Sequence, residues 1–183
     1  MTHSVSYTKD GDLGIITVNN PPVNALSQHV RQGLSETFKA ASADETTAVI
    51  LICDGRTFIA GADISEFGKP MAPPNFLDTL GTMESMPKPV IAAIHGTALG
   101  GGLETALCCH YRVAVPSARV GLPEVHLGLL PGAGGTQRLP RLIGAEAALE
   151  AIAKGIQIPA KAAHAQGVID ELVEEGKLLE GAK

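Results

Sequence analysis

Hydrophobic and polar positions divide the chain into short strands and helices of moderate length. Residues 5–9 and 13–18 flank Asp10-Gly11-Asp12, and an Asp-Gly pair between such segments is typical of a hairpin. A continuous apolar run predicts a buried strand over residues 48–53, and residues 90–94 are predicted to form the next buried strand. Shorter apolar stretches predict two further strands, over residues 111–115 and 168–173. Apolar positions spaced by three or four residues predict helices over residues 27–41, 76–83, 101–109, 136–143, 145–154 and 159–166, the first capped by Ser27. Strands that alternate with helices indicate an α/β fold with a partly parallel sheet.

Composition narrows the class of protein further. With 183 residues, 45% hydrophobic and 18% charged, and with no repeat or linker, residues 1–183 are expected to form one domain. A net charge of −5, 3% aromatic residues and no cluster of Lys and Arg argue against a nucleic-acid partner. The apolar runs are too short to span a membrane. A start without a secretory signal, and three cysteines without a disulfide pattern, predict a cytoplasmic location.

Glycine and proline mark two further segments. Residues 68–75 (GKPMAPPN) form a loop that is a candidate for a mobile lid. Gly132-Ala133-Gly134-Gly135 looks like a dinucleotide fingerprint, but its spacing is wrong, so close backbone packing is the favoured interpretation. The common signatures of serine hydrolases, zinc proteases and phosphate-binding loops do not occur in the sequence.

Two segments of small residues follow buried strands and leave backbone open to a ligand. In the first, residues 58–64, Asp63 either caps a short helix at a plain turn or belongs to a binding site. In the second, residues 99–104, three glycines precede a helix whose N–H groups could hold a developing negative charge. Glu104 there either complements the helix dipole or takes part in catalysis.

A second carboxylate, Glu124, lies among apolar residues in Leu122-Pro123-Glu124-Val125. If buried there, its pKa would be raised; the alternative is an ordinary surface glutamate in a loop. Two open-backbone turns with two carboxylates suit a site that polarises a carbonyl and moves protons at the neighbouring carbons.

The order and spacing of four motifs resemble the enoyl-CoA hydratase/isomerase (crotonase) family. These motifs are Asn24-Ala25-Leu26, Ala60-Gly61-Ala62-Asp63-Ile64, residues 98–104 (ALGGGLE) and residues 123–139 with their Gly-rich turn. The resemblance covers nearly the whole chain and implies a crotonase-like (ClpP/crotonase) spiral of repeated ββα units. His110-Tyr111-Arg112 and the segment from Gly121 to Glu124 look most like the N-terminal hydratase half of bifunctional hydratase–dehydrogenase enzymes.

The resemblance also implies roles for individual residues. The N–H groups of Ala62 and Gly101 would form an oxyanion hole for a thioester carbonyl, Glu104 would activate water, and Glu124 would donate a proton to Cα. Coenzyme A contacts are implied for Val23, Ala25, Leu26, Ala60, Asp63 and Ile64. Neither a metal nor a cofactor beyond the coenzyme A thioester substrate is expected.

Hydration of trans-2-enoyl-CoA in fatty-acid β-oxidation is the reaction that the two glutamates favour, because isomerisation needs only the counterpart of Glu124. Isomerase, thioester hydrolase or other enolate chemistry, and a fragment that binds acyl-CoA without turnover, are the alternatives. Single-function members continue with C-terminal helices that are expected to be missing here. The chain is therefore expected to form a trimer-type homo-oligomer or to be linked to a dehydrogenase domain.

The remaining polar and sulfur-containing residues are interpreted mainly as structural. Adjacent residues cannot all face one ion, so the run Cys108-Cys109-His110 is not taken as a metal cluster. His95, Tyr111 and Arg112 are expected to serve packing or turns. Near the Gly-rich turn, Arg138 and Arg141 either lie on a solvated helix face or meet coenzyme A phosphates.

Overall fold

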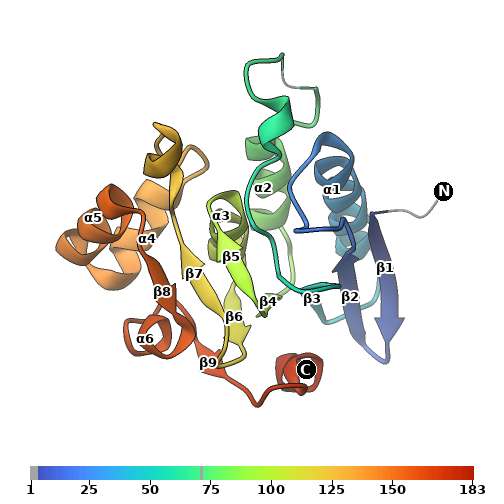
Figure 1. Cartoon of the computed structure of the whole chain (residues 1–183). Helices are drawn as coiled ribbons and strands as arrows, with labels where there is room; N and C mark the ends of the chain where they lie inside the picture. The colour runs from blue at the N-terminus through green and yellow to red at the C-terminus, as the bar shows by residue number, and fades with distance from the viewer. Residues whose placement is uncertain (1–3, 71) are drawn as a thin grey trace.

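The larger of two sheets forms the frame of the molecule in the computed structural model, which describes residues 4–70 and 72–183 (Figure 1). Its strand order is β1-β2-β3-β4-β6-β9, antiparallel between β1 and β2 and parallel elsewhere. The strands are β1 Val5–Asp10, β2 Leu13–Val18, β3 Ala48–Cys53, β4 Val90–Ile94, β6 Tyr111–Ala114 and β9 Glu171–Leu172. The predicted hairpin and the partly parallel sheet are confirmed.

A second, smaller sheet was not predicted from the sequence. It has the order β5-β7-β8, formed by Thr97–Leu99, Arg119–Gly121 and Gln157–Pro159. Strands of three residues are too short to show an alternating pattern, which explains why they were missed. In particular, β8 takes Pro159, which the sequence assigned to the start of a helix.

Seven α-helices and two 3-10 turns are present among the described residues. They are α1 Gln28–Ala43, α2 Phe76–Glu84, α3 Gly101–Cys108, α4 Gly135–Ile143, α5 Ala145–Lys154, α6 Ala160–Ala165, α7 Leu178–Ala182, η1 Ile64–Glu66 and η2 Glu124–Leu127. Ser27 stands at the predicted N-cap of α1, but its hydroxyl contacts the His29 ring rather than a helix N–H. None of these helices is long and apolar enough to cross a membrane.

The predicted last strand, residues 168–173, is wrong for its first half. Val168 and Ile169 are buried in a turn, and only β9 pairs with the sheet. Their N–H groups donate to the carbonyl of Ala163 in α6, so the backbone is satisfied without a strand partner. The apolar character of Val168 and Ile169 therefore reflects burial in a turn rather than in a strand.

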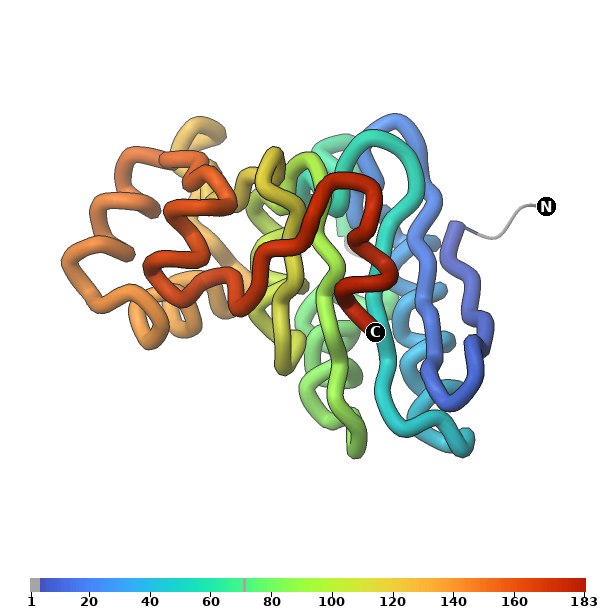
Figure 2. Tube along the Cα trace, turned by 90° about the horizontal axis from the view of Figure 1, so that it is seen from below, coloured from blue at the N-terminus to red at the C-terminus, as the bar shows by residue number. Residues whose placement is uncertain are grey.

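Helices cover the sheet on different sides. Helix α1 packs on β1 and β2 beside α2, and α3 lies between α2 and α4 (Figure 1). The C-terminal segment crosses the sheet so that α7 packs on β4 and β6 (Figure 2). Phe38 of α1 and Phe58, in the segment after β3, are fully buried in the common core.

Parallel strands β3 and β4 decide where a ligand can bind. The carboxyl ends of parallel neighbours lie at one edge of a sheet, and ligands commonly bind outside that edge. The segment after β3 leads to Ala62, and the segment after β4 leads through β5 to the start of α3. Both open-backbone turns predicted from the sequence therefore lie at the same edge.

Candidate active site

The turn before α1 lies directly against the segment that contains Ala62. Leu26 and Ala62 form an isolated parallel bridge, in which the Leu26 N–H donates to the Gly61 carbonyl at 2.9 Å. Between the same two segments, the N–H of Ala60 donates to the carbonyl of Val23 at 3.1 Å. These bonds bring together residues that are almost forty positions apart in the chain.

Gly101 is the first residue of α3, so its N–H lacks an intrahelical carbonyl partner. A Cβ at Gly101 would lie 3.1 Å from Leu26 Cδ1 and 3.2 Å from Phe76 Cε1, so a larger residue would push on both. A Cβ at Gly102 would lie only 1.9 Å from the carbonyl oxygen of Ile59. The glycines thus allow the positive end of α3 to sit against the segment that leads to Ala62.

A cavity of about 440 Å³ opens at this point. Ala62, Gly101, Glu104 and Glu124 all contribute to its walls, and most of the remaining lining is apolar. The structure therefore brings together all four residues for which the resemblance implied chemical roles.

Glu104 is held firmly inside the protein. It is 3% exposed, and its Oε1 accepts hydrogen bonds from the N–H of Ala133 at 2.7 Å and of Gly135 at 2.9 Å. Oε2 accepts no hydrogen bond from the residues that the structure describes, and it is not fully buried. Because Glu104 lines the cavity, this oxygen faces it. One oxygen anchors the carboxyl group, and the other is free to meet a ligand.

Glu124 is held in a different way. It begins η2 and is half-buried, and its Oε2 is the one buried side-chain oxygen or nitrogen without a partner in the described part of the chain. Burial raises the pKa of the Glu124 carboxyl, and the negative charge of Glu104 raises it further. A hydrogen bond from the backbone N–H of Glu124 itself partly lowers this pKa. Glu124 is therefore not the ordinary surface glutamate that the sequence left as an alternative.

Two predicted contact residues lie at the rim. Asp63 caps η1, with its Oδ1 accepting from the N–H of Ser65 at 2.9 Å, and this partner lowers the pKa of Asp63. Ile64 is 68% exposed and lines the 440 Å³ cavity, while Asp63 lines a neighbouring cavity of about 400 Å³. Ala25 is half-buried in the turn before α1.

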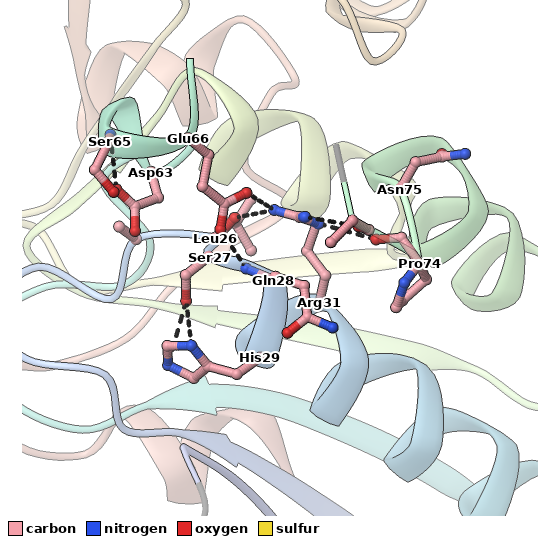
Figure 3. A network of polar contacts seen from close by, with 12 residues as sticks. Leu26, Ser27, Gln28, His29, Arg31, Asp63, Ser65, Glu66, Pro74 and Asn75 are labelled. Carbon is pink, nitrogen blue, oxygen red and sulfur yellow. Dashed lines mark hydrogen bonds and ion pairs between the residues drawn. The ribbon is translucent and has the colours of Figure 1, made fainter. Parts of the chain in front are cut away.

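Arg31 of α1 is a buried arginine beside the turn before α1, and the sequence did not predict a role for it (Figure 3). The Arg31 side chain is 4% exposed and donates to Leu26 O at 2.9 Å, Glu66 Oε2 at 2.8 Å and Pro74 O at 3.0 Å. It joins α1 to the turn before it, to η1 and to the segment before α2. The available signal was spacing, because Arg31 lies three positions from buried Leu34 on the same helix face.

The predicted lid is only partly described. Residue 71 of the segment 68–75 lies outside the described residues, and mobility of this loop stays a prediction. The carbonyl of Ala72 accepts from Arg31 at 3.2 Å, and that of Pro73 accepts from Gln28 at 3.0 Å. These bonds connect the second half of the loop to α1.

The close backbone packing predicted for the Gly-rich turn 132–135 is present at Gly134 and Gly135, whereas Gly132 has nothing within 4 Å of an added Cβ. A Cβ at Gly135 would lie 3.0 Å from Glu104 Oε1, so glycine is needed for the approach. Arg138 is not on a freely solvated face, because it contacts both Glu84 and the carbonyl of Ala133.

Other residues considered in the sequence are bonded or buried within the protein. The ring Nδ1 of His110 accepts from the N–H of Val90, and buried Arg112 pairs with Asp170. Burial raises the pKa of the Cys108 thiol to about 12. Within residues 4–70 and 72–183, no three His, Cys, Asp or Glu side chains are placed to hold a metal ion.

The cavity places the backbone of Ala62 and Gly101 beside two carboxyl groups in largely apolar surroundings. Such an arrangement is chemically able to stabilise an oxyanion and to exchange protons nearby, which is typical of an enzyme's active site. The family model for enoyl-CoA hydratase/isomerase matches residues 8–183, and the chain belongs to that family.

Relatives with known names support this assignment. The chain is 52% identical over 165 residues to the "Peroxisomal bifunctional enzyme" of Danio rerio, covering 89% of this chain and 23% of that protein. It is 42% identical over 190 residues to the "Probable enoyl-CoA hydratase" of Bacillus subtilis (strain 168), covering 99% and 74%. The chain thus spans about a quarter of the bifunctional relative.

Solved structures show the same fold. The enoyl-CoA hydratase of Bacillus anthracis superposes with a TM-score of 0.90 at 37% identity, covering 98% of this chain and 73% of that one. A second, from Geobacillus kaustophilus, gives 0.91 at 38% identity, covering 97% and 72%. The predicted crotonase-like fold is confirmed.

Proposed function

We propose that this chain acts as an enoyl-CoA hydratase, adding water across the double bond of trans-2-enoyl-CoA thioesters in fatty-acid β-oxidation. The observation that carries the proposal is the shared cavity of Glu104 and Glu124 beside the N–H groups of Ala62 and Gly101. Addition of water needs a base for the water and an acid for Cα, and two carboxyl groups supply both.

The thioester carbonyl oxygen is placed between the N–H groups of Ala62 and Gly101. As water attacks Cβ, the electron pair of the double bond moves toward this oxygen, and the enolate charge develops at the positive end of α3. Binding here is stronger for the enolate than for the ground-state carbonyl, which is the condition for lowering the barrier.

The two carboxyl groups divide the proton transfers. Glu104 Oε2 takes one proton from water as the oxygen–Cβ bond forms, and Glu124, whose raised pKa favours the protonated form, gives a proton to Cα as the enolate collapses. The product is a 3-hydroxyacyl-CoA, and solvent exchange restores both groups.

Coenzyme A is assigned to the adjoining backbone of Val23, Ala25, Leu26, Ala60, Asp63 and Ile64. The hydrogen bond between Ala60 and Val23 supports this assignment because it joins the two segments into one surface beside the oxyanion donors. No cofactor beyond the thioester is included in the proposal.

The test is the loss of conjugated enoyl-thioester absorbance when the purified protein meets crotonoyl-CoA. We expect rapid loss with the wild type and a fall of roughly 10²–10⁴-fold in kcat for Glu104→Gln and for Glu124→Gln. Glu45→Gln, at an exposed position, is the matched control. Hydration that survives Glu104→Gln would contradict the two-carboxylate scheme.

Two further outcomes identify the alternatives. Turnover of a 3-enoyl-CoA without hydration would assign isomerase chemistry, and tight binding of acyl-CoA without turnover would assign a binding role. Calorimetry with a saturated acyl-CoA measures the latter.

Assembly and location follow as separate proposals. We propose that residues 1–183 form one unit that assembles as a trimer-type homo-oligomer or is joined to a dehydrogenase domain, and light scattering tests the first form. The cytoplasmic location predicted from the sequence stays a prediction, since the Danio rerio relative is named as peroxisomal. Imaging of the tagged full-length protein would decide it.

A further inference from the structure

The backbone that anchors Glu104 has little conformational preference of its own. Its two N–H donors, from Ala133 and Gly135, flank Gly134, which has a φ of +97°. Glycine populates such left-handed conformations as readily as others, so the turn between residues 132 and 135 needs an outside contact to keep one shape.

Arg138 provides that contact. Its Nη1 donates to the carbonyl of Ala133 at 3.0 Å, which belongs to the peptide group between the two N–H donors. Its backbone N–H donates to the carbonyl of Gly134 at 2.8 Å. A Cβ at Gly134 would lie 1.9 Å from Arg138 Nη1, so only glycine lets the guanidinium lie against the turn.

The guanidinium is itself fixed from a second element. Its Nε donates to Glu84 Oε1 at 3.1 Å, and its Nη2 donates to the same oxygen. Glu84 is the last residue of α2, and the Arg138 side chain is only 25% exposed. A continuous series of contacts therefore runs from α2 through Arg138 and Ala133 to Glu104.

We propose that Arg138 is a positioning residue for Glu104. Arg138 does not line the 440 Å³ cavity and acts through the turn, keeping the Ala133 and Gly135 N–H groups on Oε1 and directing Oε2 toward the cavity. An effect of Arg138 on catalysis rests on the proposed function. Its effect on the position of Glu104 does not, because that depends only on the contacts of the turn.

The catalytic test compares Arg138→Met with Arg141→Met. Arg141 lies on the same helix and lines neither the 440 Å³ nor the 400 Å³ cavity; among the described residues it bonds only to Gln137 one turn away, which makes it the matched control. We expect kcat for crotonoyl-CoA hydration to fall about 10–100-fold in Arg138→Met, with KM changed less than about twofold, because misplacement of a reacting group costs rate rather than binding. Arg138→Lys should recover part of kcat, and Arg141→Met should leave it unchanged.

The double variant Arg138→Met/Glu104→Gln distinguishes a positioning role of Arg138 from a general loss of structure. If Arg138 acts through Glu104, Arg138→Met should lower kcat in the Glu104→Gln background by less than about twofold, measured at high enzyme concentration. An equal loss in both backgrounds, or an unchanged kcat in the single variant, would overturn the proposal. If Arg138→Met fails to fold, Glu84→Ala removes the acceptor of both Arg138 bonds while keeping the arginine, and a smaller fall in kcat is expected.

A second readout does not depend on activity. Amide hydrogen exchange at Ala133 and Gly135 should accelerate in Arg138→Met and not in Arg141→Met. Unchanged exchange would overturn the positioning role whatever the enzyme does. Absence of wild-type hydration would instead contradict the proposed function, and the exchange result would still decide the role of Arg138.

Discussion

Leu26 and Ala62 meet in a single parallel bridge, closed by the hydrogen bond from the Leu26 N–H to the Gly61 carbonyl at 2.9 Å. The carbonyl of Leu26 accepts from buried Arg31 at 2.9 Å. The proposed oxyanion donor at Ala62 therefore depends on a side chain of α1, which lies outside the cavity of the two glutamates.

Arg31→Met should destabilise the protein strongly. The change removes the donor to three segments and leaves the buried carbonyl of Leu26 and the half-buried carbonyl of Pro74 without this donor. Losing one member of such a network costs about 3 kcal/mol, which urea unfolding would measure as a lower midpoint. Arg56→Met, at an exposed position with one bond to Pro22, should stay within about 0.5 kcal/mol. Equal losses for both variants would contradict the assigned role.

Glu124 should make stability depend on pH. Burial raises its pKa, so the folded protein keeps this proton to a higher pH than the unfolded chain does. The neutral carboxyl of Glu124 therefore stabilises the folded state fully below its pKa in the unfolded chain, about 4.3. This contribution is lost as the pH rises through its higher pKa in the folded protein. Glu124→Gln cannot ionise, so its Tm relative to wild type should rise between about pH 4 and pH 8. A constant difference in Tm, matching that of Glu45→Gln, would refute this.

Gly102 and Gly81 should respond to alanine in opposite directions. A Cβ at Gly102 meets the Ile59 carbonyl oxygen at 1.9 Å, and since backbone must move, Gly102→Ala should cost about 3 kcal/mol or more. Gly81 lies in α2 with nothing within 4 Å of a new Cβ, so Gly81→Ala should add up to about 1 kcal/mol through helix propensity. The free energies of unfolding in urea give both values. A tolerated Gly102→Ala would mean that α3 does not rest on the Ile59 segment.

Phe76 should influence the preferred acyl length if the chain is a hydratase. It lines both the 440 Å³ and the 400 Å³ cavities, together with Ala62, Phe67 and Leu129. Phe76→Ala should open one cavity to the other, and each newly buried methylene contributes about 0.8 kcal/mol, or roughly fourfold in kcat/KM. The ratio of kcat/KM for a longer enoyl-CoA to that for crotonoyl-CoA measures the effect. An unchanged ratio would show that the acyl chain does not reach this wall.

Local patterns in the sequence were sufficient for the frame of the molecule. The hairpin around Gly11, the buried strands β3 and β4, and the helices with apolar spacing all depend on burial periodicity and turn chemistry, which neighbouring residues carry. The motifs around Ala62, Gly101, Glu104 and Glu124 were also visible as small residues and carboxylates after buried strands. Their roles came from resemblance, and the structure confirmed that they share one cavity.

Only the tertiary structure decided what surrounds those residues. The three-residue strands β5, β7 and β8 exist because segments far apart in the chain pair with one another, and an isolated run of three residues has no detectable period. Likewise, the Arg31 network and the hold of Arg138 on the turn above Glu104 join residues from separate elements. The sequence by itself determined which residues could do chemistry, while tertiary contacts decided their burial, their hydrogen bonds and the direction in which each carboxyl group faces.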